Sequence, residues 1–256
     1  MSSLANGFRA RLLARDWVAG TFINLGSPLT AEIAGRAGFD WLMIDQEHGP
    51  GSDETLLAQL QAISGTPATA VVRIAANETV RFKRVLDLGA GGVMVPYVST
   101  EAEAKAAVAA VRYPPRGIRG VSKFNRAAGF GQDFEDYFAH AHERVVTIVQ
   151  IETVEALNHL DAIASVDGVD ALFVGPLDLS TNLGVPGEFD HPKVVDARKQ
   201  VAEACRKAGK AAGLLLASPA AIPAAREEGF TLIALSSDGG AVATGLRATV
   251  AALRAK

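Results

Sequence analysis

Eight short apolar runs, separated by alanine-rich stretches, constrain the fold of this chain more than any other feature. The runs are rich in Val, Ile, Leu and Phe and almost continuously apolar, which is typical of parallel strands covered on both faces. In the stretches between them, such as 101–113 and 192–209, apolar residues return every three or four positions, as in amphipathic helices. The expected strands span residues 20–25, 41–45, 68–73, 92–98, 145–152, 171–176, 211–216 and 232–238.

Eight strand–helix units in 256 residues predict an α/β fold of the (β/α)8 TIM-barrel type. No linker or change of composition divides the chain, so we expect residues 1–256 to form a single barrel domain with a short N-terminal surface helix. A doubly wound sheet is the alternative, but it normally has fewer strands and a glycine fingerprint after the first strand. The glycine-rich run at 89–92 precedes an expected strand instead of following one.

The charge balance and the absence of long apolar segments limit the possible partners. The 28 acidic and 25 basic side chains give a net charge of −3 without any basic block, which argues against nucleic acid as a partner. No stretch reaches the ~18 apolar residues of a membrane span, and the N-terminus lacks the apolar core of a signal peptide. We therefore expect a cytoplasmic protein without a membrane partner.

Polar side chains gather where the expected strands end. In (β/α)8 barrels the chemistry takes place at the C-terminal ends of the strands, so these residues are the candidate site. They include the run Asp45, Gln46, Glu47 and His48, then Arg73, then Gln150 and Glu152, then Asp178, and finally Ser236, Ser237 and Asp238.

Two of these residues, Glu152 and Asp178, form a candidate metal site. They end adjacent strands, which lie ~4.8 Å apart. Two carboxylates at that separation repel each other unless a cation lies between them, and hard oxygen ligands favour Mg²⁺ or Mn²⁺. The alternative is that Asp178 caps a helix and Glu152 pairs with a lysine.

His48 and Arg73 are the candidates for acid–base chemistry and anion binding. His48 is next to two acids in the sequence, and a carboxylate partner raises the basicity of an imidazole. Arg73 ends an apolar strand, where a buried guanidinium needs an anion such as a substrate carboxylate. The alternatives are an ordinary loop histidine and a structural salt bridge to a barrel acid. No expected strand contains the lysine that a Schiff-base aldolase would need, so carbonyl chemistry here would use a metal.

The order and spacing of several motifs resemble the HpcH/HpaI family of class II pyruvate aldolases. The motifs are FDWLMIDQEHGP at 39–50, AVVR at 70–73, RYPPRGIRG at 112–120, VQIET at 149–153 and FVGPLDLS at 173–180. The resemblance covers about residues 20–238. It implies a (β/α)8 barrel, a divalent metal (Mg²⁺, Mn²⁺ or Co²⁺), and homohexamers whose subunits exchange their last helix.

The resemblance also implies a role for each matching residue. Glu152 and Asp178 match the metal ligands, His48 the base, and Arg73 the arginine that stabilises the developing enolate. Asp45 and Asp87 match acids that orient the histidine and increase its basicity. The residues expected to bind the 2-oxo acid are Gln150, Gly175, Pro176, Leu177 and Asp178, together with Arg73.

The resulting hypothesis is a reversible retro-aldol cleavage of 4-hydroxy-2-oxo acids into pyruvate or hydroxypyruvate and an aldehyde. Leu177 and the run at 236–238 depart from the family pattern, which leaves the choice of acceptor and donor open. Three alternatives remain: a lyase of the citryl or malyl thioester type, a phosphate-handling barrel that uses Gly239 and Gly240, and a non-catalytic sugar-acid binding barrel.

Overall fold

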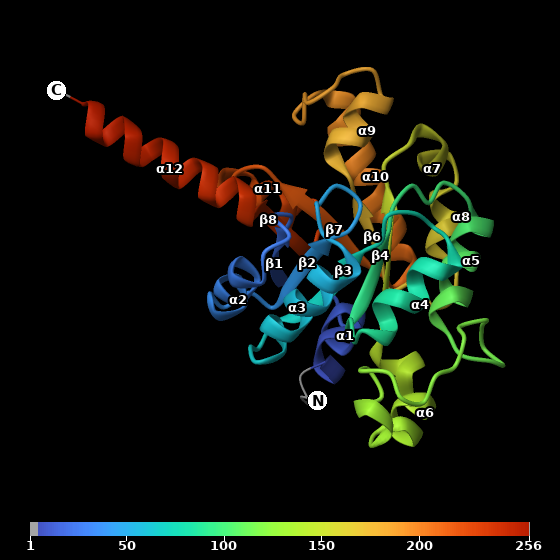
Figure 1. The fold of residues 1–256 in the computed structure, drawn as a ribbon. Helices are drawn as coiled ribbons and strands as arrows, with labels where there is room; N and C mark the ends of the chain where they lie inside the picture. The colour runs from blue at the N-terminus through green and yellow to red at the C-terminus, as the bar shows by residue number, and fades with distance from the viewer. Residues whose placement is uncertain (1–4, 256) are drawn as a thin grey trace.

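Eight parallel strands close into one barrel in the computed structural model, which describes residues 5–255 (Figure 1). Each strand pairs with the next along the chain, and β8 closes the barrel by pairing with β1. The closed sheet confirms the fold predicted from the eight apolar runs. The strands are β1 (Val18–Ile23), β2 (Trp41–Asp45), β3 (Thr69–Arg73), β4 (Gly92–Val95), β5 (Val146–Ile151), β6 (Ala171–Val174), β7 (Ala211–Leu216) and β8 (Leu232–Ser237).

Helices connect the strands and cover the outside of the barrel. None of the helices between residues 5 and 255 is both long and apolar enough to cross a membrane. The helices are α1 (Ala5–Leu13), α2 (Pro28–Arg36), α3 (Asp53–Ser64), α4 (Thr79–Asp87), α5 (Glu101–Val111), α6 (Phe134–Arg144), α7 (Val154–Asn158), α8 (Leu160–Ala164), α9 (Pro176–Asn182), α10 (Pro192–Ala208), α11 (Ile222–Glu227) and α12 (Asp238–Arg254), with two 3-10 turns at Gly129–Gly131 and Pro219–Ala221.

Two apolar cores explain why the strands are apolar on both faces. Successive side chains of a strand point to opposite faces, so one set lies inside the barrel and the other lies beneath the helices. In β2, Trp41 and Met43 belong to the cluster inside the barrel, whereas Leu42 and Ile44 belong to the outer cluster. The strands are therefore fixed from both sides, and their C-terminal ends form a rigid rim.

Helix α1 closes the N-terminal end of the barrel. Phe8 and Leu12 are buried in the inner cluster, and the Phe8 ring lies 6.4 Å from the Trp41 ring, centroid to centroid. Arg9 Nε donates to the buried Asp170 at 3.0 Å. The expectation of a surface helix was therefore wrong, because the two apolar side chains, one turn apart, fill the floor of the barrel.

Helix α12 projects away from the barrel body (Figure 1). Its apolar side chains at Val242, Leu246, Val250 and Leu253 are between 45 and 81% exposed. Exposed apolar side chains at such spacing along one helix are unusual unless another surface covers them.

The long connection from α5 to β5 lies at the N-terminal ends of the strands. It contains the RYPPRGIRG segment, which begins where α5 ends and therefore faces away from the C-terminal rim of its own barrel. A loop of this length in a barrel usually serves the mouth of the site or a contact with another subunit. The topology excludes the mouth of the same chain.

Candidate active site

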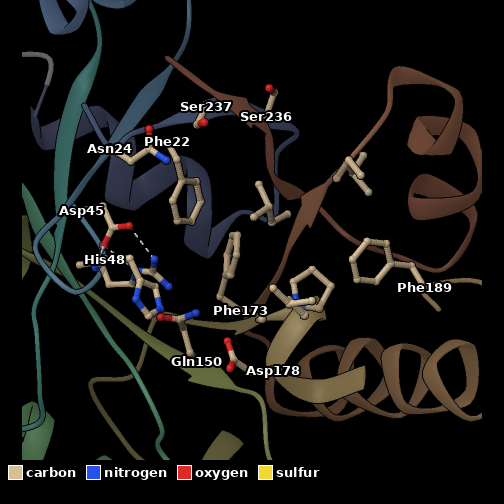
Figure 2. A pocket seen from close by; sticks show the side chains of 17 residues that line it. Phe22, Asn24, Asp45, His48, Gln150, Phe173, Asp178, Phe189, Ser236 and Ser237 are labelled. Carbon is tan, nitrogen blue, oxygen red and sulfur yellow. Dashed lines mark hydrogen bonds and ion pairs between the residues drawn. The ribbon is translucent and has the colours of Figure 1, made fainter. Parts of the chain in front are cut away.

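A cavity of about 410 Å³ opens at the C-terminal ends of the strands, where the sequence placed the candidate site (Figure 2). Phe22, Phe173 and Leu215 contribute apolar surface to its lining. The polar side chains that line it come from both sides of the barrel, and they are Asn24, Asp45, His48, Arg73, Gln150, Asp178, Ser236 and Ser237.

Tyr97 joins the two carboxylates of the predicted metal site. Its backbone N–H donates to Glu152 Oε1 at 2.8 Å, and its hydroxyl donates to Asp178 Oδ1 at 3.0 Å. Gln150 Nε2 donates to the other oxygen of Glu152 at 3.1 Å. The structure therefore brings together Gln150, Glu152 and Asp178 as predicted, and it adds Tyr97, which sequence reasoning missed.

The signal for Tyr97 lies in its backbone. With φ of +52° it occupies the left-handed region, which non-glycine residues rarely adopt and which is frequently retained at functional sites. This conformation directs its N–H and its hydroxyl toward the acidic pair. A sequence does not reveal a positive φ at a tyrosine, so the residue could be identified only from the structure.

Electrostatics favours a cation between these groups. The pKa of Glu152 is raised to about 7, mainly because the side chain is buried; the Tyr97 N–H and Arg73 oppose the rise, and the negative charges of Asp178 and Glu47 add to it. Glu152 is only 1% exposed, so solvent does little to relieve the repulsion. Two hard carboxylates fit a divalent ion whose other ligands are water or substrate oxygens. Within residues 5–255 there is no group of three His, Cys, Asp or Glu side chains that could complete a metal site alone.

Gly175 makes the close approach of these side chains possible. A Cβ at this position would collide with Glu152 Oε2 and would lie 3.3 Å from Gln150 Nε2. Pro176 then begins α9, whose first intrahelical bond runs from the Leu179 N–H to the Gly175 carbonyl. The preceding N–H groups of the helix, in residues 177 and 178, therefore lie at its N-terminus beside the cavity, where an anion is favoured.

Two acids hold Arg73: Asp45 at the end of β2 and Glu47 in the loop that follows it. Its Nε and Nη2 donate to the two oxygens of Asp45 at 3.0 and 2.7 Å, and Nη1 lies 3.0 Å from Glu47 Oε2. Burial lowers the pKa of Arg73, but the neighbouring carboxylates, Asp45 first, outweigh that effect and raise it. The guanidinium therefore stays charged and fixed at the edge of the cavity.

His48 is exposed at the mouth of the cavity, and its neighbours differ from those expected. Its side chain is 68% exposed, and the nearest acid is Glu47, whose Oε2 lies 3.9 Å from Nε2. Asp45 accepts from the backbone N–H of His48 at 3.2 Å, but its two oxygens bind Arg73. In this chain Asp45 therefore positions Arg73 and the loop, and Glu47 is the acid beside the imidazole. Burial raises the pKa of Glu47 despite the nearby cations.

Asp87 does not reach this cavity. It ends α4, near the N-terminal ends of the strands, and pairs with the fully buried Arg119 at 2.8 Å. The structure therefore does not bring Asp87 and His48 together within one chain.

The first turn of α12 does not provide the phosphate site that Gly239 and Gly240 suggested. The Gly239 N–H donates to Asp238 Oδ1 at 2.8 Å, and the Gly240 N–H donates to Ser237 Oγ at 3.0 Å. These N–H groups are already satisfied, and the Asp238 carboxylate would repel a phosphate. We therefore set aside the phosphate-handling alternative.

The fold and the cavity place the chain among the (β/α)8 barrels with a charged site at the C-terminal rim, and comparison with known proteins defines its class further. The family model described as HpcH/HpaI aldolase/citrate lyase matches residues 19–244. The chain belongs to this family, as the sequence motifs predicted.

Relatives and solved structures agree with this membership over nearly the whole chain. The 5-keto-4-deoxy-D-glucarate aldolase of Salmonella paratyphi C is 43% identical over 92% of each chain. A family protein from Burkholderia cenocepacia superposes with a TM-score of 0.94 at 38% identity, covering 98% of this chain and 100% of that one. An HpcH/HpaI aldolase from Desulfitobacterium hafniense gives 0.90 at 29% identity, covering 97% of both. The chain is thus an enzyme of the carbon–carbon lyase class, an aldolase.

Proposed function

We propose that the chain is a metal-dependent class II aldolase that cleaves 4-hydroxy-2-oxo acids reversibly into pyruvate or hydroxypyruvate and an aldehyde. The observation that carries this proposal is the acidic pair Glu152 and Asp178, which Tyr97 joins beside the cavity lined by Asp178, Arg73 and His48. The substrate in the name of the Salmonella relative is a 2-oxo acid of this class and is the first compound to assay.

Glu152 and Asp178 would hold the divalent ion, for which Mg²⁺, Mn²⁺ and Co²⁺ are the candidates. When bound, such an ion supplies Lewis-acid polarisation of the keto group and offsets the negative charge that develops on its oxygen. The pKa of Glu152 is raised, and Gln150 Oε1 has no hydrogen-bond partner among residues 5–255, so the site gains from a cation and from a substrate donor group.

The remaining side chains would orient the substrate and move one proton. Arg73 places its charge where the enolate oxygen develops, because Asp45 and Glu47 fix its guanidinium. The N–H groups at the start of α9, in Leu177 and Asp178, would bind the carboxylate of the 2-oxo acid. His48 would take the proton of the 4-hydroxyl during cleavage and return it during synthesis.

A second copy of the chain is part of this proposal. Ile118, Val121, Phe124 and Phe130 are between 52 and 74% exposed in the connection that carries Arg119, the partner of Asp87. An apolar surface beside Asp87 and an uncovered α12 both support an oligomer, and the family resemblance makes it a hexamer with an exchanged last helix. In such an assembly Asp87 would reach the His48 of another subunit, which is the role the resemblance implied. A cytoplasmic location remains a prediction from the sequence.

The deciding experiment is pyruvate release from a 4-hydroxy-2-oxo acid by EDTA-treated protein, before and after adding Mg²⁺, Mn²⁺ or Co²⁺. Activity only with metal supports the proposal, and full activity with EDTA overturns it. Inactivity in both states across several 4-hydroxy-2-oxo acids also overturns it and favours the thioester lyase or the sugar-acid binding barrel. The thioester alternative has little support because Arg73 is the only Lys or Arg among the described residues that line the cavity.

A further inference from the structure

The wall of the cavity opposite the acidic pair is also polar. Asn24 follows β1, and Ser236 lies near the end of β8, whereas Gln150, Glu152 and Asp178 belong to β5, β6 and the residues that follow them. In a closed barrel of eight strands, the β8–β1 seam faces β4–β6 across the axis. Figure 2 shows Asn24, Ser236 and Ser237 grouped on the side away from Gln150 and Asp178.

Asn24 and Ser236 have hydrogen-bonding capacity that the protein leaves unused. Asn24 Oδ1 is buried and has no partner among residues 5–255. Neither the side-chain amide of Asn24 nor the hydroxyl of Ser236 makes a hydrogen bond within that part of the chain, although both residues line the cavity. Burial of the unpaired Oδ1 opposes folding, and the Nδ2 group of Asn24 and the hydroxyl of Ser236 are the polar groups left for a ligand in the cavity.

The backbone near these two side chains adopts conformations that lower the stability of the fold. Ser236 has a φ of +59°, in the region that favours glycine. Two consecutive glycines follow in the first turn of α12, although glycine is unfavourable in helices by about 1 kcal/mol. A Cβ at Gly239 would lie 2.7 Å from Asn24 Oδ1, and a Cβ at Gly240 would lie 2.8 Å from Ser236 Oγ. Both side-chain oxygens therefore lie over the same helical turn, in space that the missing Cβ atoms leave open.

Charge decides which part of a substrate can lie at this wall. The buried Asp238 carboxylate accepts from the Asn24 N–H at 2.8 Å and from the Thr30 hydroxyl at 2.6 Å, directly behind the wall. No Lys or Arg among the described lining residues comes from β8 or β1. The carboxylate end of a 2-oxo acid is therefore disfavoured here and belongs at β5 and β6.

We propose that Asn24 and Ser236 form the subsite that binds a hydroxyl group on the aldehyde part of the substrate. The enzyme would then prefer a hydroxylated aldehyde to an aliphatic aldehyde of the same length. This inference rests on the proposed aldolase function and deepens it, because it assigns the substrate class of the acceptor and the direction in which the substrate crosses the cavity.

The test compares two acceptors of equal chain length, glyceraldehyde and propanal, with pyruvate as donor and the metal-loaded enzyme. The ratio of their kcat/KM values is the readout, because any general loss of activity cancels in it. For the unmodified enzyme we expect a ratio of at least about 30 in favour of glyceraldehyde. Asn24→Ala and Ser236→Ala should each lower the ratio by about tenfold, the usual effect of losing one hydrogen bond to a substrate hydroxyl.

Two further variants separate recognition from structure. Ser236→Gly suits the positive φ and lacks the hydroxyl, so it should lower the ratio as much as Ser236→Ala does. Asn158→Ala makes the same chemical change as Asn24→Ala on an exposed helix end outside the cavity, and it should leave the ratio unchanged. A Ser236→Gly enzyme with the original ratio would show that the hydroxyl does not bind substrate and would overturn the proposal.

A separate measurement shows which proposal has failed if the ratios disagree. Exchange of the pyruvate methyl protons for deuterium, followed by NMR, reports enolate formation at the acidic pair without any acceptor. If the unmodified, metal-loaded enzyme shows no exchange, the aldolase proposal fails. If exchange occurs but the glyceraldehyde-to-propanal ratio is near one, or both alanine variants retain it, only the acceptor subsite is overturned.

Discussion

The two ends of the barrel use the same eight strands for opposite purposes. At the N-terminal end Phe8, Leu12 and Trp41 fill the interior, and α1 closes it. At the C-terminal end the strands lead into the buried or half-buried charges of Asp45, Arg73, Glu152 and Asp178 around an open cavity. One end provides stability and the other accommodates groups that oppose folding. Substitutions at the two ends should therefore have separable effects on stability and catalysis.

The largest effect should follow from removing charge at the catalytic end. Glu152→Gln keeps the size of the side chain but removes a proposed metal ligand and its negative charge. We expect kcat/KM for retro-aldol cleavage to fall by about 10³-fold or more, since Lewis-acid catalysis contributes several kcal/mol. Arg9→Ala provides the matched control, because it removes a charge at the opposite end. Comparable activity of Glu152→Gln and the unmodified enzyme would contradict the assignment.

The closed end should respond in stability instead. Phe8→Ala removes an aromatic ring that is packed against Trp41, and such truncations destabilise proteins by about 3–5 kcal/mol. Urea denaturation should show this loss, whereas kcat at a temperature where the variant is folded should stay within about twofold. A variant with normal stability would mean that α1 is not part of the folded core.

The pH dependence of stability should reveal the strain at Glu152 in metal-free protein. Its pKa is about 7 when folded and near its ordinary value when unfolded, so the folded state binds the proton more tightly. Stability therefore decreases as the pH rises through the interval between those values, and the full loss is present above pH 7. Glu152→Gln should be more stabilising at pH 8 than at pH 4.5, by about 2 kcal/mol. Denaturation in EDTA at both pH values measures this difference, and an equal effect at both would refute it.

The smallest effect concerns the tyrosine that joins the two acids. Tyr97→Phe removes the hydroxyl that donates to Asp178, and loss of a group that positions a metal ligand typically weakens metal binding by about tenfold. Calorimetric titration with Mn²⁺ measures the change. Tyr113→Phe, a buried tyrosine at the other end of the barrel, should leave the affinity unchanged. Equal affinities for both variants would limit Tyr97 to a backbone role.

The sequence predicted the strands well because their apolar pattern is set by burial on two faces. The bounds of β2 and β7 agree with the predicted ranges, whereas β4 ends at Val95 instead of at residue 98. Pro96 has no N–H to donate, and the positive φ of Tyr97 turns the chain out of the sheet. The strand therefore ends where the pattern of apolar residues still continues.

The sequence predicted only those site residues whose positions are set by the ends of the strands. Gln150, Glu152 and Arg73 follow from the alternation of side chains and the position of each strand end. The contacts of Glu47 and Tyr97 depend on loop conformations, and burial of α1 depends on the size of the barrel floor. Asp87 was singled out by family resemblance alone, and one chain does not supply its contact with His48.

The position of α1 at the N-terminal end of the barrel has a consequence for synthesis of the chain. Helix α1 leaves the ribosome before any of the strands β1 to β8, yet Arg9 binds Asp170, which emerges 161 residues later. Its site at the N-terminal end of the barrel is complete only after β6 has been made. Strand β1 gains its second pairing partner later still, when β8 has been made. Phe8 and Leu12 thus lack their complete binding site during most of translation. Helix α1 is therefore available for chaperone contact during translation, and it docks only once β6 has been made.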